Sequence, residues 1–201
     1  MNATNCRPAW FAVLCMVSVL VCVPEHAAAQ APPGPGDFSF AAWTGYAATR
    51  VDCENCAEGE QYGDTWELGL SPLWRINSKL LAGAELVLQP SNNVNDVRTS
   101  WLVGTLQFHP WAAHGFFIKG GYGLLWVRTT LEIDGVEQDG KFRGMVVNYG
   151  AGWQFRKDRR VSFAPFGAHY VATAGTVRVQ ELEAVNVVGN SWVAGVAVYF
   201  R

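Results

Sequence analysis

Charged residues are scarce in this chain of 201 residues. They make up 16% of it, against about 25% in ordinary soluble domains. The composition therefore predicts that something other than water covers much of the surface. The 15 basic and 17 acidic residues nearly cancel, to a net charge of −2, which provides no electrostatic basis for binding nucleic acid.

Long apolar runs are also missing, apart from a short one near the start that spans Ala9 to Val23. It follows one basic residue, Arg7, and precedes the small residues Ala27 to Ala29. These are the three regions of a secretory signal peptide, and a membrane helix would need about 18 apolar residues or more. We therefore expect residues 1–29 to be a signal peptide, and we expect no transmembrane helix in the mature chain.

The mature chain alternates apolar and polar residues in short stretches rich in aromatic residues, valine and glycine. Period-two stretches separated by turn residues are typical of β-strands. Residues 30–37 form a Pro/Gly-rich linker, and residues 38–201 form one domain. Its eight expected strands are Phe38 to Arg50, Thr65 to Ile76, Lys79 to Gln89, Val97 to His109, Gly115 to Arg128, Phe142 to Arg156, Val161 to Thr173, and Asn190 to Phe200.

The connections between these strands alternate in length. "NS", "PWAAH" and "KDRR" are short, whereas the other links, such as "TTLEIDGVEQDGK" and "AGTVRVQELEAVNVVG", are mostly longer and richer in polar residues. Short turns on one rim, long loops on the other and an even strand number are typical of bacterial outer-membrane barrels. Each strand also reaches the roughly 9 to 11 residues needed to cross a bilayer. We predict an all-β fold, an eight-stranded antiparallel up-and-down transmembrane β-barrel.

The two faces of the strands differ in character. Over 145–155, large apolar residues alternate with small and polar ones, so one face suits lipid and the other a narrow polar lumen. A soluble barrel would turn its apolar face inward, and too few charges would then remain outside. The expected lumen network is Glu67, Arg75, Glu85, Lys119, Asn148 and Gln154. Buried charges need partners, so we expect a Glu85–Lys119 ion pair in a closed plug, with a gated pore as the alternative.

Seven tryptophans lie near strand ends, where aromatic belts at the lipid headgroups are expected. They are Trp43, Trp66, Trp74, Trp101, Trp126, Trp153 and Trp192. The chain finishes with "GNSWVAGVAVYFR", an alternating stretch that reaches almost to the last residue. An open sheet edge in lipid would leave backbone groups without hydrogen bonds. We therefore expect this last strand to pair with the first and close the barrel.

The segments "CENC", "LLAGAELV", "GFFIKGGYGLLW" and "VNYGAGWQF", with the closing strand, resemble the small outer-membrane β-barrel proteins of the OmpA/OmpX-like superfamily. Tyr199 and Phe200 resemble that family's carboxy-terminal assembly signal, except that Arg201 follows them. The resemblance implies a monomer in the outer membrane of a Gram-negative envelope, with both termini in the periplasm. Its expected partners are outer-membrane lipids, lipopolysaccharide and, through the last strand, the barrel-assembly machinery.

Cys53 and Cys56 are the two cysteines left in the mature chain, in an oxidising compartment. Redox catalysis would favour a helix amino terminus, and zinc would need two further ligands. We expect a disulfide that constrains the first outer loop, with redox or metal chemistry and free thiols as alternatives. The same loop holds Asp52, Glu54, Glu58, Glu60 and Asp64, which do not have the spacing of a calcium loop. We expect these acids to be solvated and expect neither a metal nor a cofactor, with binding of a divalent cation as the alternative.

His169 invites comparison with the outer-membrane lipid A deacylases, which are similar to this chain in size and topology. Their pattern places a nucleophilic serine two residues after the histidine, and Val171 occupies that position here. The sequence therefore predicts a non-enzymatic protein with a structural or binding role exerted through four extracellular loops. The alternatives are a narrow porin-like channel for small solutes and a lipid A-modifying hydrolase.

Overall fold

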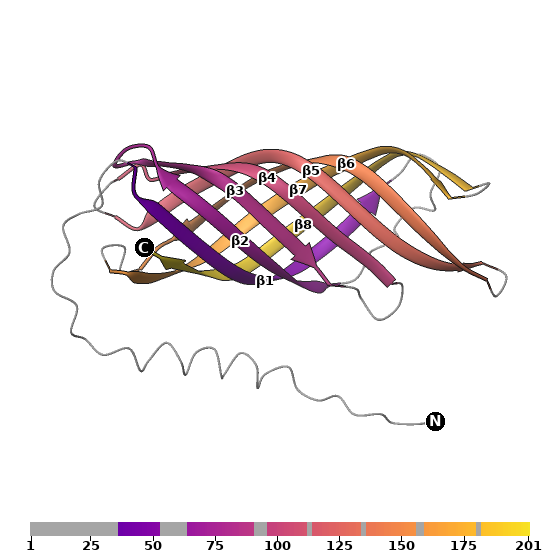
Figure 1. Ribbon diagram of the computed structural model, residues 1–201, viewed down its shortest axis with the longest axis horizontal. Helices are drawn as coiled ribbons and strands as arrows, with labels where there is room; N and C mark the ends of the chain where they lie inside the picture. Colours follow the sequence, from indigo (N-terminus) through magenta and orange to yellow (C-terminus); the bar gives the residue numbers. More distant parts are fainter. Residues whose placement is uncertain are drawn as a thin grey trace, which may run out of the picture. The chain divides into compact units, whose positions relative to one another are not determined.

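The computed structural model describes residues 36–52, 64–90, 96–111, 114–133, 136–155, 159–179 and 182–201. These residues form eight strands in one closed antiparallel barrel (Figure 1), which confirms the predicted fold class. The strands are β1 (Phe38–Asp52), β2 (Thr65–Arg75), β3 (Leu80–Gln89), β4 (Asp96–Phe108), β5 (Phe116–Ile133), β6 (Val136–Trp153), β7 (Val161–Val179) and β8 (Leu182–Phe200). The described part of the chain contains no helix with the length and hydropathy to cross a membrane. The predicted signal peptide and most of the linker lie outside the described residues.

The barrel closes where the last strand meets the first. Each strand pairs with its neighbour in sequence, and β8 pairs with β1 over a long register that runs from Phe40↔Phe200 to Asp52↔Val188. On its other side, Phe200 pairs with Val161 of β7. The last strand therefore has hydrogen-bonding neighbours on both edges, as the alternating carboxy-terminal stretch predicts, and closure removes the open edges that lipid cannot satisfy.

Two connections that were predicted to be long loops are instead extensions of strands. β5 and β6 pair up to Ile133↔Val136, and β7 and β8 pair up to Val179↔Leu182, with irregular register near Gly175. The polar residues in these segments suggested loops, and this interpretation was wrong. The same segments are rich in threonine and valine, which favour strands, and the Asp-Gly step at 134–135 in the sequence is a hairpin-turn signal. The link between β1 and β2, over 53–64, remains long, whereas the link between β3 and β4, over 90–95, is no longer than two of the three turns at the other rim.

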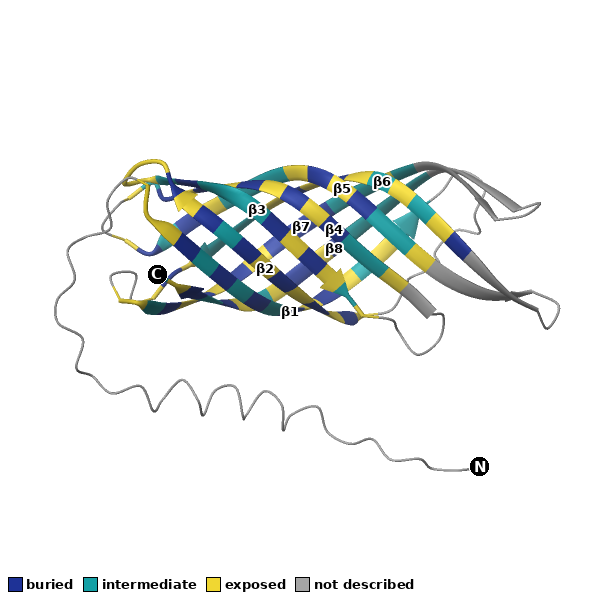
Figure 2. Ribbon diagram, in the orientation of Figure 1, coloured by how far each residue is buried: buried dark blue, intermediate teal, exposed yellow. Residues whose placement is uncertain are grey.

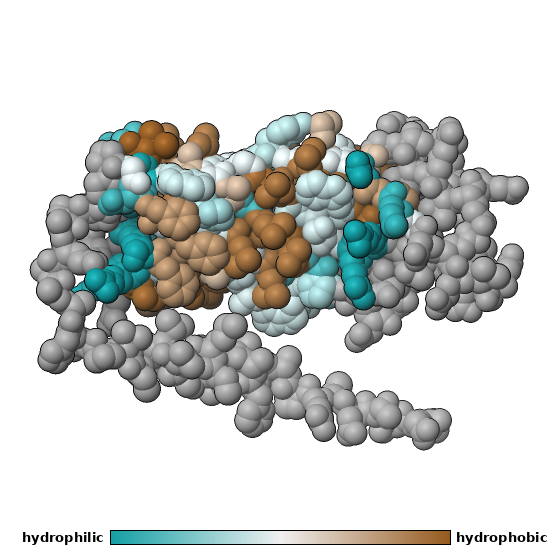
Figure 3. Space-filling model, viewed as in Figure 1, coloured by the Kyte–Doolittle hydropathy of each residue, from teal (hydrophilic) through white to brown (hydrophobic). Residues whose placement is uncertain are grey.

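Burial alternates along the strands with a period of two (Figure 2). In β2, every second side chain from Thr65 to Arg75 is buried and the others are exposed or half-buried. Large apolar side chains occupy the outward positions of all strands, and Figure 3 shows a hydrophobic band with hydrophilic residues at both edges on the face in view. Soluble proteins rarely expose contiguous apolar patches larger than a few hundred Å², so this outer surface suits a lipid environment.

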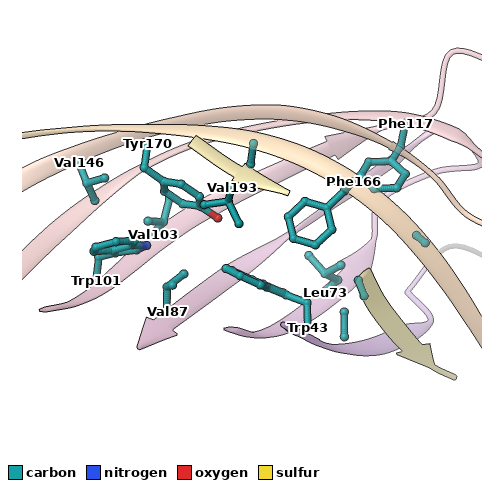
Figure 4. Close-up of a cluster of buried hydrophobic side chains, with 14 of the residues drawn as sticks. Trp43, Leu73, Val87, Trp101, Val103, Phe117, Val146, Phe166, Tyr170 and Val193 are labelled. Carbon is teal, nitrogen blue, oxygen red and sulfur yellow. The ribbon is translucent and has the colours of Figure 1, made fainter. Parts of the chain in front are cut away.

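Large aromatic side chains fill the inside of the barrel (Figure 4). They come from five strands and are Trp43, Trp101, Phe117, Phe166, Tyr170 and Tyr199. The interior of an eight-stranded barrel is just wide enough for side chains to fill it, and glycines on neighbouring strands make room for the rings. At Gly69, for example, an added Cβ would clash with the indole ring of Trp43.

Candidate functional site

An ion pair lies at the centre of the lumen. Lys119 Nζ of β5 is 2.8 Å from Glu85 Oε1 of β3, and the two side chains are only 10% and 1% exposed. Tyr170 of β7 donates a hydrogen bond of 3.2 Å from its hydroxyl to the same oxygen, and Asn148 Nδ2 of β6 donates one of 3.2 Å to Glu85 Oε2. Both carboxylate oxygens are therefore satisfied, as a charge buried in a barrel requires. The arrangement agrees with the ion pair that the sequence predicts.

Aromatic rings surround the cationic end of this pair. The Lys119 Nζ atom lies 4.9 Å from the ring centroid of Phe166, 5.5 Å from that of Trp43 and 5.8 Å from that of Tyr170. A cation within about 6 Å of an aromatic face is attracted by the ring quadrupole. Four strands thus contribute to one cluster of charge and rings that fills the cross-section of the lumen.

A small cavity lies beside the ion pair. It has a volume of about 20 Å³, and its walls include Glu85, Lys119, Gln107 and the rings of Phe117 and Phe166. This is room for about one water molecule. The geometry here is that of a packed interior with a little hydration, and a hydrated solute would not fit without movement of side chains.

Glu67 of β2 is a second buried acid in the lumen. Its Oε1 accepts a hydrogen bond of 3.2 Å from the Ser191 hydroxyl, and the Thr49 hydroxyl donates one of 3.1 Å to Ser191. Glu67 Oε2 has no hydrogen-bond partner among the described residues. The structure therefore places Glu67 in a separate polar chain that joins β1, β2 and β8.

The six predicted lumen residues do not form one network. Glu85, Lys119 and Asn148 meet at the centre, whereas Gln154 Nε2 donates a hydrogen bond of 2.7 Å to the Ser162 hydroxyl. Arg75 is buried near the short-turn rim, where its backbone nitrogen bonds the Asp37 carbonyl oxygen at 2.9 Å. All six side chains face inward, because strand alternation decides the face. Which of them touch depends on how the strands are staggered.

Sequence reasoning missed several partners of these residues. Tyr170 and Ser191 were not singled out, and neither was Gln107, which accepts a hydrogen bond of 3.1 Å from the Tyr199 hydroxyl. His109 was not among the predicted lumen residues either, and it is buried with its Nε2 atom 2.9 Å from Gln107 Nε2. Strand alternation could have indicated these residues. Gln107 and His109 are at positions i and i+2, so they face the same side, which is the lumen, where the chain leaves β4.

Five of the tryptophans predicted to form an aromatic girdle lie on the outer face of the barrel. Trp66, Trp74, Trp153 and Trp192 are exposed on the outer face, and Trp126 is half-buried there. Their positions form two belts, since Trp74 and Trp153 lie toward the short turns and the other three toward the opposite end. Ring contacts reinforce the belts: Trp74 packs on Phe38 with 5.3 Å between centroids, and Trp66 on Tyr46 with 5.7 Å.

Trp43 and Trp101 do not belong to the girdle. They are 6% and 4% exposed and point into the lumen, where Trp101 packs against Tyr170 with 5.4 Å between ring centroids. The prediction relied on their nearness to strand ends, and distance along a strand does not specify its face. Trp101 and Thr105 are four residues apart on β4 and therefore face the same side, and both are buried. Strand alternation could thus have placed Trp101 in the lumen.

His169 lies on the outer face, covered by two aromatic side chains. Its Nδ1 atom is 2.7 Å from the Tyr149 hydroxyl, and its ring stacks on Trp192 at 4.0 Å between centroids with an interplanar angle of 13°. Val171 follows on the same face two residues later. The described neighbours of His169 do not present the serine that the deacylase pattern requires.

Cys53 and Cys56 lie outside the described residues, together with most of the acidic loop around them. At the edges of that loop, Asp52 pairs with Arg50 at 2.9 Å between Oδ1 and Nε, and Asp64 Oδ2 accepts a 2.8 Å hydrogen bond from Tyr46. Within the described ranges, no three His, Cys, Asp or Glu side chains are grouped so that they could hold a metal ion.

Comparison with known proteins gives a fold and no closer relationship. No protein-family model matches the chain, and no curated protein matches it in sequence. Among solved structures, Ail, the attachment invasion locus protein of Yersinia pestis, has a TM-score of 0.53 and 13% identity, covering 83% of this chain and 99% of Ail. Ail in complex with the heparin analogue sucrose octasulfate gives 0.52 and 14%, covering 82% and 99%.

Neisserial surface protein A also matches, with a TM-score of 0.51 and 15% identity, covering 79% of this chain and 96% of that protein. Such low identities establish the fold alone. The resemblance to small outer-membrane barrels, read from sequence segments, is confirmed at that level.

Proposed function

We propose that this chain is a non-enzymatic β-barrel protein of the bacterial outer membrane, with a closed lumen and a structural or binding role exerted at its long-loop end. One observation carries the proposal. The buried ion pair of Glu85 and Lys119, surrounded by aromatic rings, occupies the middle of the barrel and leaves a cavity of only about 20 Å³ beside it. With the lumen filled, the surfaces available to partners are the outer face and the loops.

The proposed orientation rests on the position of the barrel's two ends. The backbone nitrogen of Arg75 donates to the Asp37 carbonyl at 2.9 Å, and that of Arg201 donates to the Arg160 carbonyl at 3.0 Å. The start of β1 and the end of β8 therefore lie at the rim of the short turns (Figure 1). In outer-membrane barrels the short turns face the periplasm, so both termini would be periplasmic.

The proposed partners follow from this placement. The exposed apolar band would contact outer-membrane lipids, and the rim of long connections would face the lipopolysaccharide of the outer leaflet. The terminal residues of β8, with Phe200 on the outer face and Tyr199 in the lumen, suit recognition by the barrel-assembly machinery before closure. A complete barrel leaves no open strand edge for self-association, which supports a monomer. Ail, a barrel of the same fold, forms a complex with a heparin analogue, which supports a binding role.

A narrow channel for small solutes is the second candidate. The observation that favours it is the buried polar groups that lack hydrogen-bond partners among the described residues, namely Glu67 Oε2 and the Nε and Nη2 atoms of Arg75. Such groups are commonly solvated by water. The aromatic rings packed around Lys119 oppose this candidate, because a solute would have to displace them. A hydrolase is not proposed, because Val171 occupies the position where the deacylase pattern has its nucleophilic serine.

Ion conductance across planar bilayers separates the two candidates. We expect the refolded full chain to give no conductance steps, and we expect a variant with a truncated plug, Phe166→Ala combined with Trp43→Ala, to conduct. A heat-dependent shift in gel migration should confirm that both proteins are folded. Steady conductance of the unmodified chain that changes with Glu85→Gln would overturn the closed lumen and support the channel.

A further inference from the structure

The outer face of β4, β5 and β6 changes from apolar to cationic within a few residues. Leu102, Leu124 and Met145 lie directly opposite one another across these three strands, and they are 44%, 52% and 50% exposed. The three belong to the outward hydrophobic band. They mark the last fully apolar row before the end of the barrel that carries the long connections.

The next two rows toward that end contain one and three basic residues. Ser100, Trp126 and Arg143 form the first row, and Arg98, Arg128 and Lys141 form the second, in each case as directly paired residues of β4, β5 and β6. All four basic side chains are exposed. Residues directly opposite one another have Cβ atoms about 4.5 to 5.5 Å apart, and like charges so placed destabilise a sheet. A patch of this kind favours an anionic ligand.

Three of these cations are not neutralised by neighbouring side chains that the structure describes. Arg128, Lys141 and Arg143 make no hydrogen bond or ion pair to another described residue. Arg50 on β1 offers a contrast, since it pairs with Asp52 at 2.9 Å. Asp96, Thr130 and Asp139 form the next row, which is further from the apolar band than the basic rows. An anionic group at the edge of the band would therefore lie closer to the basic rows than to this one.

We propose that Arg128, Lys141 and Arg143, with Arg98 beside them, form a binding site for the phosphate groups of lipopolysaccharide. This inference rests on the proposed function, because it needs the long-connection end of the barrel to face the outer leaflet. Lipopolysaccharide carries acyl chains and phosphates in one molecule, which matches an apolar row directly below a cationic one. Guanidinium groups bind phosphate through two parallel hydrogen bonds, and Trp126 lies at the level of the headgroups, as interfacial tryptophans do.

The cationic patch lies on one side of the barrel. At the same end, β2 presents Trp66 preceded by Asp64, and β8 presents Trp192 preceded on its outer face by Asn190. Among the described outward positions at this end, Arg128, Lys141 and Arg143 lie on β5 and β6, whereas the basic residue of β1, Arg50, pairs with Asp52. A bound glycolipid would therefore occupy a defined place on the barrel wall, which a uniform electrostatic attraction around the rim would not produce.

The test measures binding of purified lipid A to the folded full chain in detergent, by native mass spectrometry or a fluorescent lipid A. The variant Arg128→Gln with Lys141→Gln is compared with Lys79→Gln combined with Arg159→Gln, a matched removal of two exposed cations from the short-turn rim. Each basic residue near an anionic membrane surface contributes enough that losing two should weaken binding roughly thirtyfold. The control pair should bind like the unmodified chain, and dephosphorylated lipid A should bind all proteins equally weakly.

Three results would overturn the assignment. Equal affinity of both double variants for lipid A would exclude the site, as would unchanged affinity of the unmodified chain for dephosphorylated lipid A. Equally tight, equally variant-sensitive binding to phosphatidylglycerol vesicles would mean that any anionic lipid suffices. Failure of the proposed function is distinguishable from these results. In that case the unmodified chain would show no heat-dependent gel shift and no recovery in the outer-membrane fraction, whatever its affinity for lipid A.

Discussion

Strand β5 carries two cations in opposite environments, one buried in the lumen and one exposed on the outer face. Lys119 points inward, where it pairs with Glu85 at 2.8 Å and lies against three aromatic rings. Arg128 points outward, exposed, directly opposite Arg98 and Lys141. The inner cation is satisfied by the protein itself, whereas Arg128 makes no hydrogen bond or ion pair to another described residue. The same strand therefore holds one cation in a buried ion pair and leaves another exposed on the outer surface of the barrel.

The largest expected effect comes from breaking the inner pair. Lys119→Met leaves Glu85 buried without a cation, which should lower the free energy of unfolding by about 3 to 5 kcal/mol. Adding Glu85→Gln should recover much of that loss, because the uncompensated charge is then removed. Urea unfolding in phospholipid vesicles, followed by tryptophan fluorescence, measures both.

Arg128→Met is the matched control on the outer face of the same strand, and its effect should stay within about 0.5 kcal/mol. If Lys119→Met and Arg128→Met were equally mild, the contrast between the inner and outer cations would fail.

A smaller effect is expected from substituting two adjacent glycines of β5. They compare the inner and outer faces of the strand without changing a charge. A Cβ added at Gly121, which faces inward, would lie 2.5 Å from the Gly104 carbonyl oxygen and 2.6 Å from Val103 Cγ1. At Gly120, which faces outward, the nearest atom would be the Asn148 carbonyl oxygen at 3.6 Å. We expect Gly121→Ala to destabilise the barrel by about 1 to 3 kcal/mol through overpacking, and Gly120→Ala to be neutral. Equal unfolding midpoints for the two variants would show that the lumen is not tightly packed.

The smallest expected effect comes from salt. Raising sodium chloride from about 0.05 M to about 0.5 M shortens the screening length and weakens interactions between exposed charges, while buried pairs are screened much less. Lipid A binding should therefore weaken several-fold, and the free energy of unfolding of the unmodified chain should change little. Titrations at the two salt concentrations measure the first, and urea unfolding the second. Salt-independent binding would point to apolar contacts in place of the phosphates.

The barrel itself could be predicted from the sequence because of a simple geometric rule. Side chains alternate across a strand, so the positions of Glu67, Glu85 and Lys119 relative to apolar neighbours specified which face they occupy. Strand length and the pattern of turns then indicated a membrane-crossing barrel. The same rule would have moved Trp101 from the girdle to the lumen, and it was overlooked there because nearness to a strand end was given more weight.

Strand alternation could not predict how far the strands extend or which lumen residues touch. The pairing of β5 with β6 as far as Ile133↔Val136 depends on two segments forming a hairpin, and their polar residues are equally compatible with a loop. The separation of Gln154 and Arg75 from the central ion pair depends on stagger between strands that lie far apart in the sequence. Alternation carries no information about stagger.

The sequence alone determined the class of fold, the number of strands and the face of most side chains, because these follow from composition and from a period of two that is local in the chain. The tertiary structure decided which residues meet. Only the register across three strands places Arg98, Arg128 and Lys141 side by side, and only closure of the barrel brings Tyr170 onto Glu85, 85 residues apart in the chain. Contacts of this kind depend on shear and closure, which no local pattern encodes.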